Sequence, residues 1–361
     1  MLASPAWPPS TTDVAFHELA DTAGRVGAAP VDRLAFATWL GGHTARLAPG
    51  TAGAFLATLV AVGDVDVALA RTVEPHLDAL GILAQAGVHV PADAVLGVFA
   101  AEAPGLALTA TAVDGATGAD DATPVLLAGT KPWCSLASSL THALVTAHVG
   151  SAGGAARGLF LVDLRHPGVT THDDRWVARG MPDVPSAPVD FDDVPATPVG
   201  DPGWYLSRPG FAWGGIGVAA CWYGGALGLA RTLRTWAAAH ADSELAQHAL
   251  GATVLDLQDA EDALAGAAAL IDGHADAGTG AGAGAEVDWS LVAQTVRSRV
   301  RAACDRIRTR TVSTIGPAPL TTDPVVAARV ADLELYLLQD HGDRDVARVG
   351  RIVLDRGGLA W

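Results

Sequence analysis

The sequence predicts a mostly α-helical protein with a central β domain, on three observations. Apolar residues recur at helical spacing between residues 11 and 86 and again after residue 213, whereas the period falls towards two between residues 94 and 200. Turn-forming residues multiply in that middle stretch. Of the 361 residues, 50% are hydrophobic and 17% are charged, which indicates a buried core and excludes a disordered chain.

An N-terminal helical domain is expected over residues 1–92. Its first helix is indicated by the spacing of Phe16 and Leu19. A longer helix is predicted over residues 65–83. Asp64 is its expected N-cap, because an aspartate side chain accepts hydrogen bonds from the free N–H groups of a first helical turn.

A β domain is expected over residues 93–205. Its strands are separated by turn signals, and no helix is predicted between them. Strands that follow one another in this way predict an antiparallel barrel or sandwich. The six predicted strands are Val95–Ala101, Leu106–Val113, Val125–Ala128, Ala143–Val149, Leu159–Leu164 and Val189–Phe191.

The remaining residues, 206–361, predict a helical bundle. A Gly/Ala-rich linker is expected at Asp272–Glu286; its glycines match G-x-G-x-x-G, but no strand precedes them, so a phosphate-binding loop is not favoured. The predicted helices are Gly215–Ala241, Glu244–Ile271, Val287–Arg310, Pro324–Gln339 and Asp345–Asp355.

Charge and cysteine content exclude several classes of protein. There are 39 acidic and 23 basic residues, and a net charge of −16 repels nucleic-acid phosphates. The three cysteines are scattered without C-x-x-C spacing, so neither a disulfide framework nor a metal site is expected. Residues 211–230 carry no charge, but their glycines fit a helix buried in a bundle better than a membrane span. With no secretory signal at the N-terminus, we expect a cytoplasmic protein.

Four stretches carry a family resemblance. They are Leu-Ala-Gly-Thr-Lys-Pro-Trp-Cys-Ser at residues 127–135, Val-Asp-Phe-Asp-Asp-Val-Pro at 189–195, the Gly/Ala-rich helix after Phe211, and Asp332–Tyr336. In this order they resemble the acyl-CoA dehydrogenase family, whose flavoproteins have an N-terminal helical domain, a β domain and a C-terminal four-helix bundle. The resemblance implies that fold, FAD as the cofactor, an acyl substrate such as an acyl-CoA, and assembly as a homodimer or homotetramer.

The resemblance also implies that the flavin ring lies beside Trp133 and Ser135. A flavin ring is flat and apolar on its faces and polar along one edge, so Trp133 would form an aromatic wall and Ser135 would bond the polar edge. Residues two apart point to the same side of an extended strand, which predicts that both side chains face the ring. The alternative is a core tryptophan and a strand-end serine.

A second flavin contact is expected from Phe99, Ala100 and Ala101, in a stretch similar to the family's Tyr-x-x-Thr-Glu-Pro segment. The backbone N–H groups of the two alanines would bond the ring. Ala101 replaces the threonine, and the Gly-Ser-Asp that follows in the family is absent. The segments that would hold the adenine half are also altered, since residues 239–243 lack the family's arginine and residues 315–319 lack its Gly-Gly-x-Gly.

The family's oxidation removes a proton next to a thioester carbonyl, which needs a positioned carboxylate base. Aligning on Asp332–Tyr336 places Asp340 at the position of the family's catalytic glutamate, whereas aligning on the downstream segment places the inert amide Gln339 there. In the alternative reading Asp340 is a solvated helix-end residue. His341 keeps a further alternative open, because a related branch of the fold hydroxylates its substrates and has a histidine in this region.

The leading hypothesis is therefore an FAD-dependent oxidoreductase that carries out α,β-dehydrogenation of an acyl thioester. The first alternative is a flavin-dependent monooxygenase of the same fold. The second is a non-catalytic paralogue that acts as a partner subunit in a hetero-oligomer, because several of the family's cofactor-binding motifs are altered.

Overall fold

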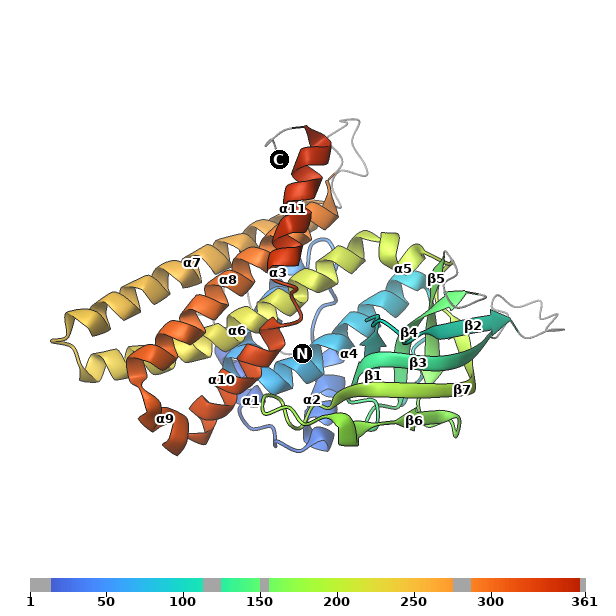
Figure 1. Ribbon diagram of the computed structural model, residues 1–361, viewed down its shortest axis with the longest axis horizontal. Coiled ribbons are helices and arrows are strands. Elements are labelled where there is room, and N and C mark those ends of the chain that lie inside the picture. The colour runs from blue at the N-terminus through green and yellow to red at the C-terminus, as the bar shows by residue number, and fades with distance from the viewer. Residues whose placement is uncertain (1–13, 113–124, 150–155, 275–286, 358–361) are drawn as a thin grey trace.

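The computed structural model describes residues 14–112, 125–149, 156–274 and 287–357. Figure 1 shows a group of helices on one side and a β region on the other, with the helix α4 (Val67–Ala86) beside the β region. The order of helices, strands and helices confirms the fold class expected from the sequence periodicity.

Four helices come first in the chain. The third is almost wholly buried and crosses the long helix α6 (Pro209–Ala239) at glycines. A Cβ atom on Gly63 would lie 2.7 Å from the carbonyl oxygen of Cys221, and one on Gly224 would lie 2.5 Å from that of Val60, so this crossing requires glycine on both helices. The helices that precede α4 are α1 (Val14–Ala23), α2 (Pro30–Gly41) and α3 (Ala52–Val65).

The N-cap of α4 is Asp66, not Asp64. The Oδ1 atom of Asp66 accepts a hydrogen bond from the backbone N–H of Leu69 at 2.9 Å. Asp64 still belongs to α3, and its buried carboxylate pairs with Arg231 at 2.6 Å. The prediction was wrong by two residues because α3 continues almost to the start of α4, which the apolar spacing did not reveal.

The β region is a closed, mixed sheet. The strand order β1-β4-β2-β3-β7-β5, together with the pairing of β5 with β4, closes it into a barrel, and β6 pairs with β7. The expectation of purely antiparallel pairing is wrong, because β4 runs parallel to both β1 and β2. The strands are β1 (Leu96–Phe99), β2 (Leu108–Ala112), β3 (Val125–Ser135), β4 (His142–Val149), β5 (Arg157–Asp163), β6 (Val169–Thr171) and β7 (Ser186–Pro198).

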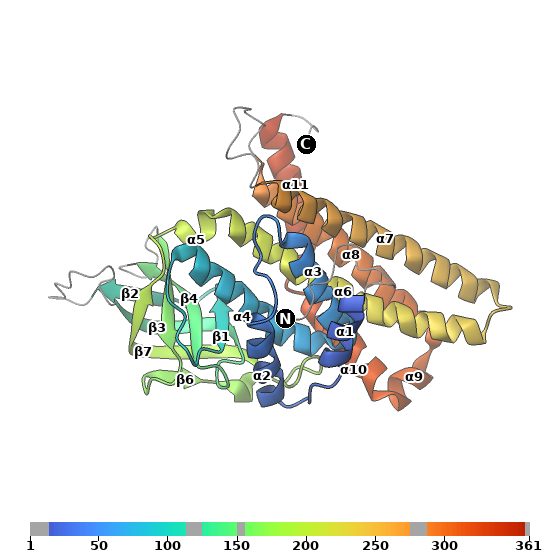
Figure 2. The same ribbon diagram turned by 180° about the vertical axis from the view of Figure 1, so that it is seen from behind.

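Long helices form the C-terminal bundle. Figures 1 and 2 both show α6 running beside α7 (Glu244–Gly273) and α8 (Trp289–Ile315), and α10 (Pro324–Leu337) packs against α6 and α8. The short helices α5 (Trp204–Ser207) and α9 (Pro317–Thr322) precede α6 and α10, and α11 (Asp343–Arg356) follows α10. Most of the predicted linker, residues 275–286, lies outside the described residues, but Asp272 and Gly273 belong to α7.

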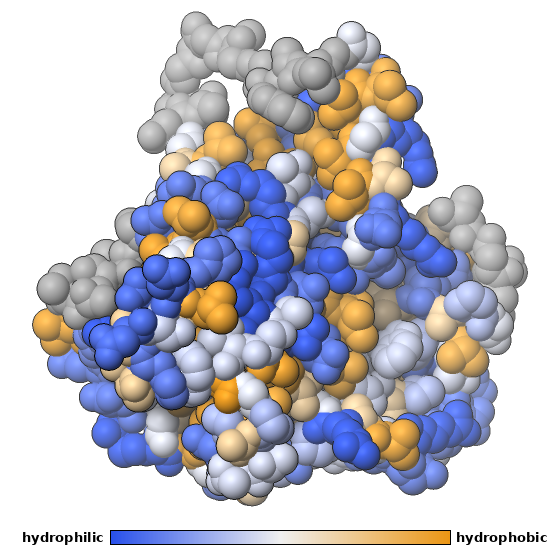
Figure 3. All heavy atoms as spheres, turned by 60° about the vertical axis from the view of Figure 1, so that its left-hand side comes forward, coloured by the Kyte–Doolittle hydropathy of each residue, from blue (hydrophilic) through white to orange (hydrophobic). Residues whose placement is uncertain are grey.

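The helix α11 stands away from the bundle. It has no buried residue, and Val346 and Leu354 are 56% and 81% exposed. Figure 3 shows apolar side chains gathered at this upper end of the molecule. Among the helices that the structure describes, none is both long and apolar enough to cross a membrane.

Candidate active site

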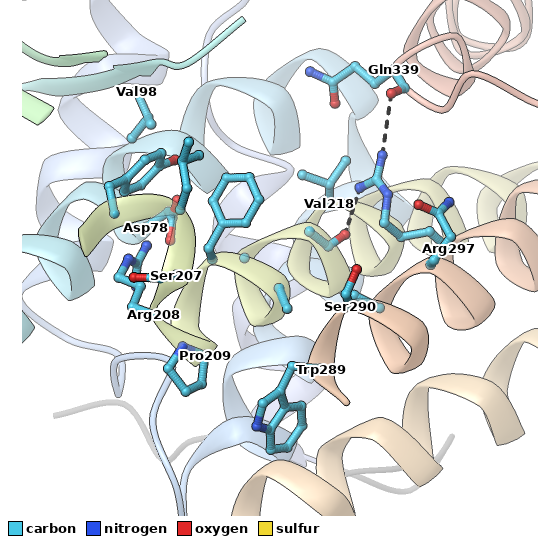
Figure 4. Close-up of a pocket in the computed structure, with 18 of the residues that line it drawn as sticks. Asp78, Val98, Ser207, Arg208, Pro209, Val218, Trp289, Ser290, Arg297 and Gln339 are labelled. Atoms are coloured by element: carbon cyan, nitrogen blue, oxygen red, sulfur yellow. Dashed lines mark hydrogen bonds between the residues drawn. The ribbon is translucent and has the colours of Figure 1, made fainter. Parts of the chain in front are cut away.

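A cavity of about 860 Å³ lies where α4, α6 and α8 meet, close to the β region. Figure 4 shows Asp78 of α4, Arg208 before α6, Arg297 of α8 and Val98 of β1 around it. Its volume falls within the range of about 300–1,000 Å³ that is usual for small-molecule sites. Its aromatic lining consists of Tyr205, Phe211 and Trp289.

Three side chains of α4 give one wall of the cavity its charge. Arg71, Glu74 and Asp78 all line the cavity, and their spacing of three and four residues places them on one helix face. The prediction of this helix rested on its apolar residues alone and therefore did not identify the charged face. The signal was nevertheless present in the sequence, because these three residues are the only Asp, Glu, Lys or Arg residues in α4.

Burial decides the protonation of the two acids. Burial, helped by the nearby Asp78 carboxyl, raises the pKa of Glu74 to about 8, in spite of the guanidinium groups of Arg71 and Arg297. Burial also raises the pKa of Asp78 to about 6, although Arg208 opposes this shift. At neutral pH Glu74 therefore keeps its proton, whereas Asp78 is largely ionised.

Arg297 of α8 lines the cavity and donates hydrogen bonds to α6 and to the segment after α10. Its Nη1 donates to the carbonyl oxygen of Gly215 at 2.7 Å, and its Nη2 donates to that of Gln339 at 3.4 Å (Figure 4). The guanidinium carbon lies 4.7 Å from the ring centroid of Trp222. Burial lowers the pKa of Arg297, although several acidic groups oppose this.

Arg71 links the cavity to the segment predicted to hold the flavin. Its Nη2 donates a hydrogen bond to Oγ of Ser135 at 2.7 Å. A much smaller pocket beside it is lined by both residues and by Phe99, and it shares Pro75 and Val98 with the large cavity. The large cavity therefore adjoins the end of β3.

The two flavin residues predicted on β3 do not share one side of an extended strand. The pairing of β3 with β7 shifts between Lys131 and Cys134, and Trp133 within this bulge has a φ of +59°. Trp133 is 59% exposed, whereas Ser135 is only 7% exposed and its Oγ lies 2.6 Å from that of Ser186. The simple alternation of strand side chains fails here because the bulge interrupts it.

The flavin contacts expected at these positions stay predictions. Trp133 offers an exposed aromatic surface, which a flat ring can cover. Ser135 has a hydroxyl group, but it already accepts from Arg71 and contacts Ser186. Of the other predicted contacts, Phe99 is buried at the end of β1, Ala100 is half-buried, and Ala101 is exposed just beyond the strand.

Beside this segment, Lys131 is fixed inside the barrel. It is 1% exposed, and its Nζ donates to Glu102 at 2.8 Å and to Thr146 at 2.9 Å. Glu102 also pairs with Arg157 at 3.1 Å. Burial lowers the pKa of Lys131, whereas the Glu102 carboxylate raises it. Glu102, which the sequence comparison matched to the family's flavin segment, therefore neutralises a buried ammonium group.

The two predicted catalytic residues, Asp340 and His341, differ in how far their side chains are buried. Asp340 is 3% exposed, its Oδ1 accepts from the backbone N–H of Gly342 at 2.8 Å, and burial raises its pKa. Its neighbour Gln339 lines the cavity, but Asp340 does not. The side chain of His341 is 69% exposed and lies 3.5 Å from Asp345. Their catalytic roles stay predictions.

Comparisons with known proteins identify the fold. No protein-family model matches the sequence, and no curated protein sequence matches it. Among solved structures, the FMN-bound dibenzothiophene monooxygenase TdsC from Paenibacillus sp. A11-2 is similar over 94% of this chain and 96% of its own, with 17% identity and a TM-score of 0.75.

Two further structures have the same architecture. A nitrososynthase from Micromonospora carbonacea var. africana covers 92% of each chain, with 18% identity and a TM-score of 0.70. Butyryl-CoA dehydrogenase from Megasphaera elsdenii covers 84% of this chain and 82% of its own, with 16% identity and a TM-score of 0.69. This chain therefore has the acyl-CoA dehydrogenase-like fold.

Proposed function

We propose that this chain is a flavin-dependent oxidoreductase whose substrate occupies the cavity between α4, α6 and α8. The observation that carries the proposal is the hydrogen bond from Arg71 to Ser135, because Arg71 lines the cavity and Ser135 belongs to the segment expected to meet the flavin. The exposed ring of Trp133 in the same segment supports contact with a flat ligand. A bound flavin would supply the redox chemistry, and the cavity would orient the substrate.

For the cofactor, we favour FMN over the FAD expected from the family. FMN lacks the adenine half of FAD, and the segments that would hold that half, residues 239–243 and 315–319, depart from the family's motifs. They lie at the turn between α6 and α7 and at the start of α9. The structure of TdsC with FMN supports the same choice.

For the reaction, we favour oxygenation of the substrate over α,β-dehydrogenation of an acyl thioester. Dehydrogenation needs an ionised carboxylate at the substrate's α carbon. Glu74 is protonated at neutral pH because burial raises its pKa to about 8, and Asp340 does not line the cavity. Asp78 is largely ionised, but its charge is attracted by Arg208, which lines the same cavity. A protonated Glu74 between Arg71 and Arg297 instead donates hydrogen bonds to a polar substrate group.

The first experiment measures flavin binding. Quenching of flavin fluorescence would be followed as FMN or FAD, oxidised or reduced, is titrated with purified protein. We expect Trp133→Ala to weaken binding by about tenfold or more, because it removes the aromatic wall. Trp236→Ala, on α6 outside the residues that line the cavity, is the control and should bind as the wild type does. A protein that takes up neither flavin in either redox state would support the partner-subunit alternative instead.

A second experiment separates the two reactions. Butyryl-CoA would be added anaerobically to the flavin-loaded protein, and the absorption of the oxidised flavin would be followed. Bleaching would establish a dehydrogenase. No bleaching, together with incorporation of an oxygen atom from O₂ into an added substrate by the reduced protein, would establish a monooxygenase, because reduced flavin also consumes oxygen without transferring it.

We further propose that the protein forms a homodimer or homotetramer. The exposed apolar residues of α11, Val346 and Leu354, support contact with another copy. Light scattering after size-exclusion chromatography would measure the mass, and Leu354→Asp tests the contribution of α11.

A further inference from the structure

A buried arginine with free donors lies at the start of α6. Arg208 is only 8% exposed and lines the cavity. Its Nη1 donates to Oε1 of Gln85 at 2.6 Å, but its Nε and Nη2 have no hydrogen-bond partner among the described residues. A buried guanidinium donor without a hydrogen-bond partner raises the free energy of the folded protein. We therefore expect Nε and Nη2 of Arg208 to pair with a hydrogen-bond acceptor when a ligand is bound.

Aromatic rings hold the guanidinium in place. Its central carbon lies 5.2 Å from the ring centroid of Tyr205 and 5.7 Å from that of Trp204. The backbone also approaches closely, since a Cβ atom on Gly210 would lie 2.2 Å from Nη1 of Arg208. Arg208 is therefore fixed against the first turn of α6.

The same position is the positive end of a long helix. Arg208 is the N-cap of α6, which has 31 residues, and no side chain caps its first turn. Free N–H groups and the helix dipole favour an anion at such an end. The unpaired guanidinium edge and the uncapped helix end thus favour the same charge.

The charges that line the cavity point to the same class of ligand. Within the described residues Arg208 forms no ion pair, but it lies on the same side of the cavity as Asp78 (Figure 4), close enough to oppose the rise in the pKa of that carboxyl group. Burial raises the pKa of Glu74 to about 8, so this acid keeps its proton at neutral pH. The other charged residues that line the cavity are two acids against five arginines: Asp78, Asp288, Arg71, Arg208, Arg297, Arg348 and Arg356. The inner cavity is therefore positive, although the chain carries a net charge of −16.

We infer that this cavity binds a small molecule through an oxyanion group, a carboxylate or a phosphate monoester. Two oxygens of that group accept from Nε and Nη2 of Arg208, as planar guanidinium groups favour, and the N-terminus of α6 adds to the attraction. The aromatic side chains of Tyr205, Phe211 and Trp289 contact the rest of the molecule. Only the description of this molecule as a substrate rests on the proposed function.

The test measures anion binding by calorimetry on protein without flavin. Benzoate and phenyl phosphate are the two probes, and neutral benzamide is the matched control. We expect at least one anion to bind about tenfold or more tightly than benzamide, because only the anions accept charge-assisted hydrogen bonds from Arg208. The tighter of the two anions identifies the oxyanion that the site takes.

Two substitutions test the role of Arg208. Arg208→Gln should weaken binding of the preferred anion about tenfold or more, whereas Arg33→Gln, which removes an equally buried guanidinium outside the cavity, should not. Gln85→Glu is nearly isosteric and places a carboxylate against Nη1 of Arg208. It should weaken anion binding to a similar extent, so it tests the inference even where Arg208→Gln fails to fold.

Equal binding of benzoate, phenyl phosphate and benzamide would overturn the inference. Unchanged anion binding in the Gln85→Glu variant would overturn it as well. A protein that binds an anion but no flavin contradicts only the proposed function, and one that binds flavin but neither anion contradicts only this inference.

Discussion

Arg71 of α4 donates a hydrogen bond to Ser135 at the end of β3. Its guanidinium carbon also lies 5.7 Å from the ring centroid of Tyr336 on α10. One side chain therefore contacts the N-terminal helices, the barrel and the C-terminal bundle. A buried link between three parts of a fold should contribute to stability as well as to the site.

A double-mutant cycle measures that contribution. Arg71→Ala and Ser135→Ala should each destabilise the protein, and their coupling free energy should be about 1–2 kcal/mol, because a hydrogen bond from a charged donor is lost only once. Urea denaturation of the two single variants and the double variant gives the value. Thr109→Ala replaces Ser135→Ala in the control cycle, where coupling with Arg71→Ala should fall below about 0.5 kcal/mol.

Glu74 should make the protein less stable as the pH rises. Its pKa in the folded protein, about 8, is above the ordinary value of 4.5, so the cost of ionising it is absent below 4.5 and complete above about 8. Within that window Glu74→Gln should reduce the fall in the free energy of unfolding by up to about 1.4 kcal/mol per pH unit. Urea denaturation across this range measures the slope, and Glu244→Gln, at an exposed site, should leave it unchanged.

Asp272 should stabilise the start of α3 from a distant helix. Its Oδ1 accepts from the backbone N–H of Ala52 at 2.8 Å, and Thr51, the N-cap residue, makes no such bond with its side chain. Asp272→Ala should lower the free energy of unfolding by about 1 kcal/mol, as other lost caps do. Thermal denaturation measures the change. The exposed Asp262→Ala on the same helix is the control, and an equal loss there would contradict the capping role.

Asp340 and His341 can be separated as candidate catalytic residues. If Asp340 removes a substrate proton, Asp340→Asn should slow anaerobic bleaching of the flavin by roughly 10²–10⁴-fold while flavin binding is kept, because the shape hardly changes. If His341 handles a substrate proton in oxygenation, His341→Ala should slow only that reaction. Stopped-flow absorption measures both reactions. No change in either variant would show that this segment is not catalytic.

Much of the helical architecture was predictable from sequence. The long helices α7 and α8 follow from sustained apolar spacing, and Ser243 before α7 accepts from the backbone N–H of Ala246, as an N-cap should. The strands were located by alternation and turn signals. Their pairing was not predictable, because the parallel alignment of β4 with β1 and β2 joins segments that are distant in the chain.

The candidate site was less accessible to sequence reasoning. The bulge that turns Trp133 outward needs a positive φ at a tryptophan, and no local residue preference signals that conformation. The roles of Arg208 and Arg297 depend on the meeting of α6 with α8, which periodicity does not specify. Glu74 was visible as a charge in an apolar helix, but its raised pKa arises only from burial.

The ion pair of Lys131 inside the barrel has a practical chemical consequence. Lys131 is the only lysine in the 361-residue chain and is 1% exposed. In the folded protein, amine-reactive reagents therefore meet no accessible lysine, and acylation of Lys131 requires the barrel to open around it. The rate at which Lys131 itself is acylated, read by mass spectrometry of the peptide that contains it and so separately from the α-amino group of the chain, thus reports the opening of the β region with no engineered label.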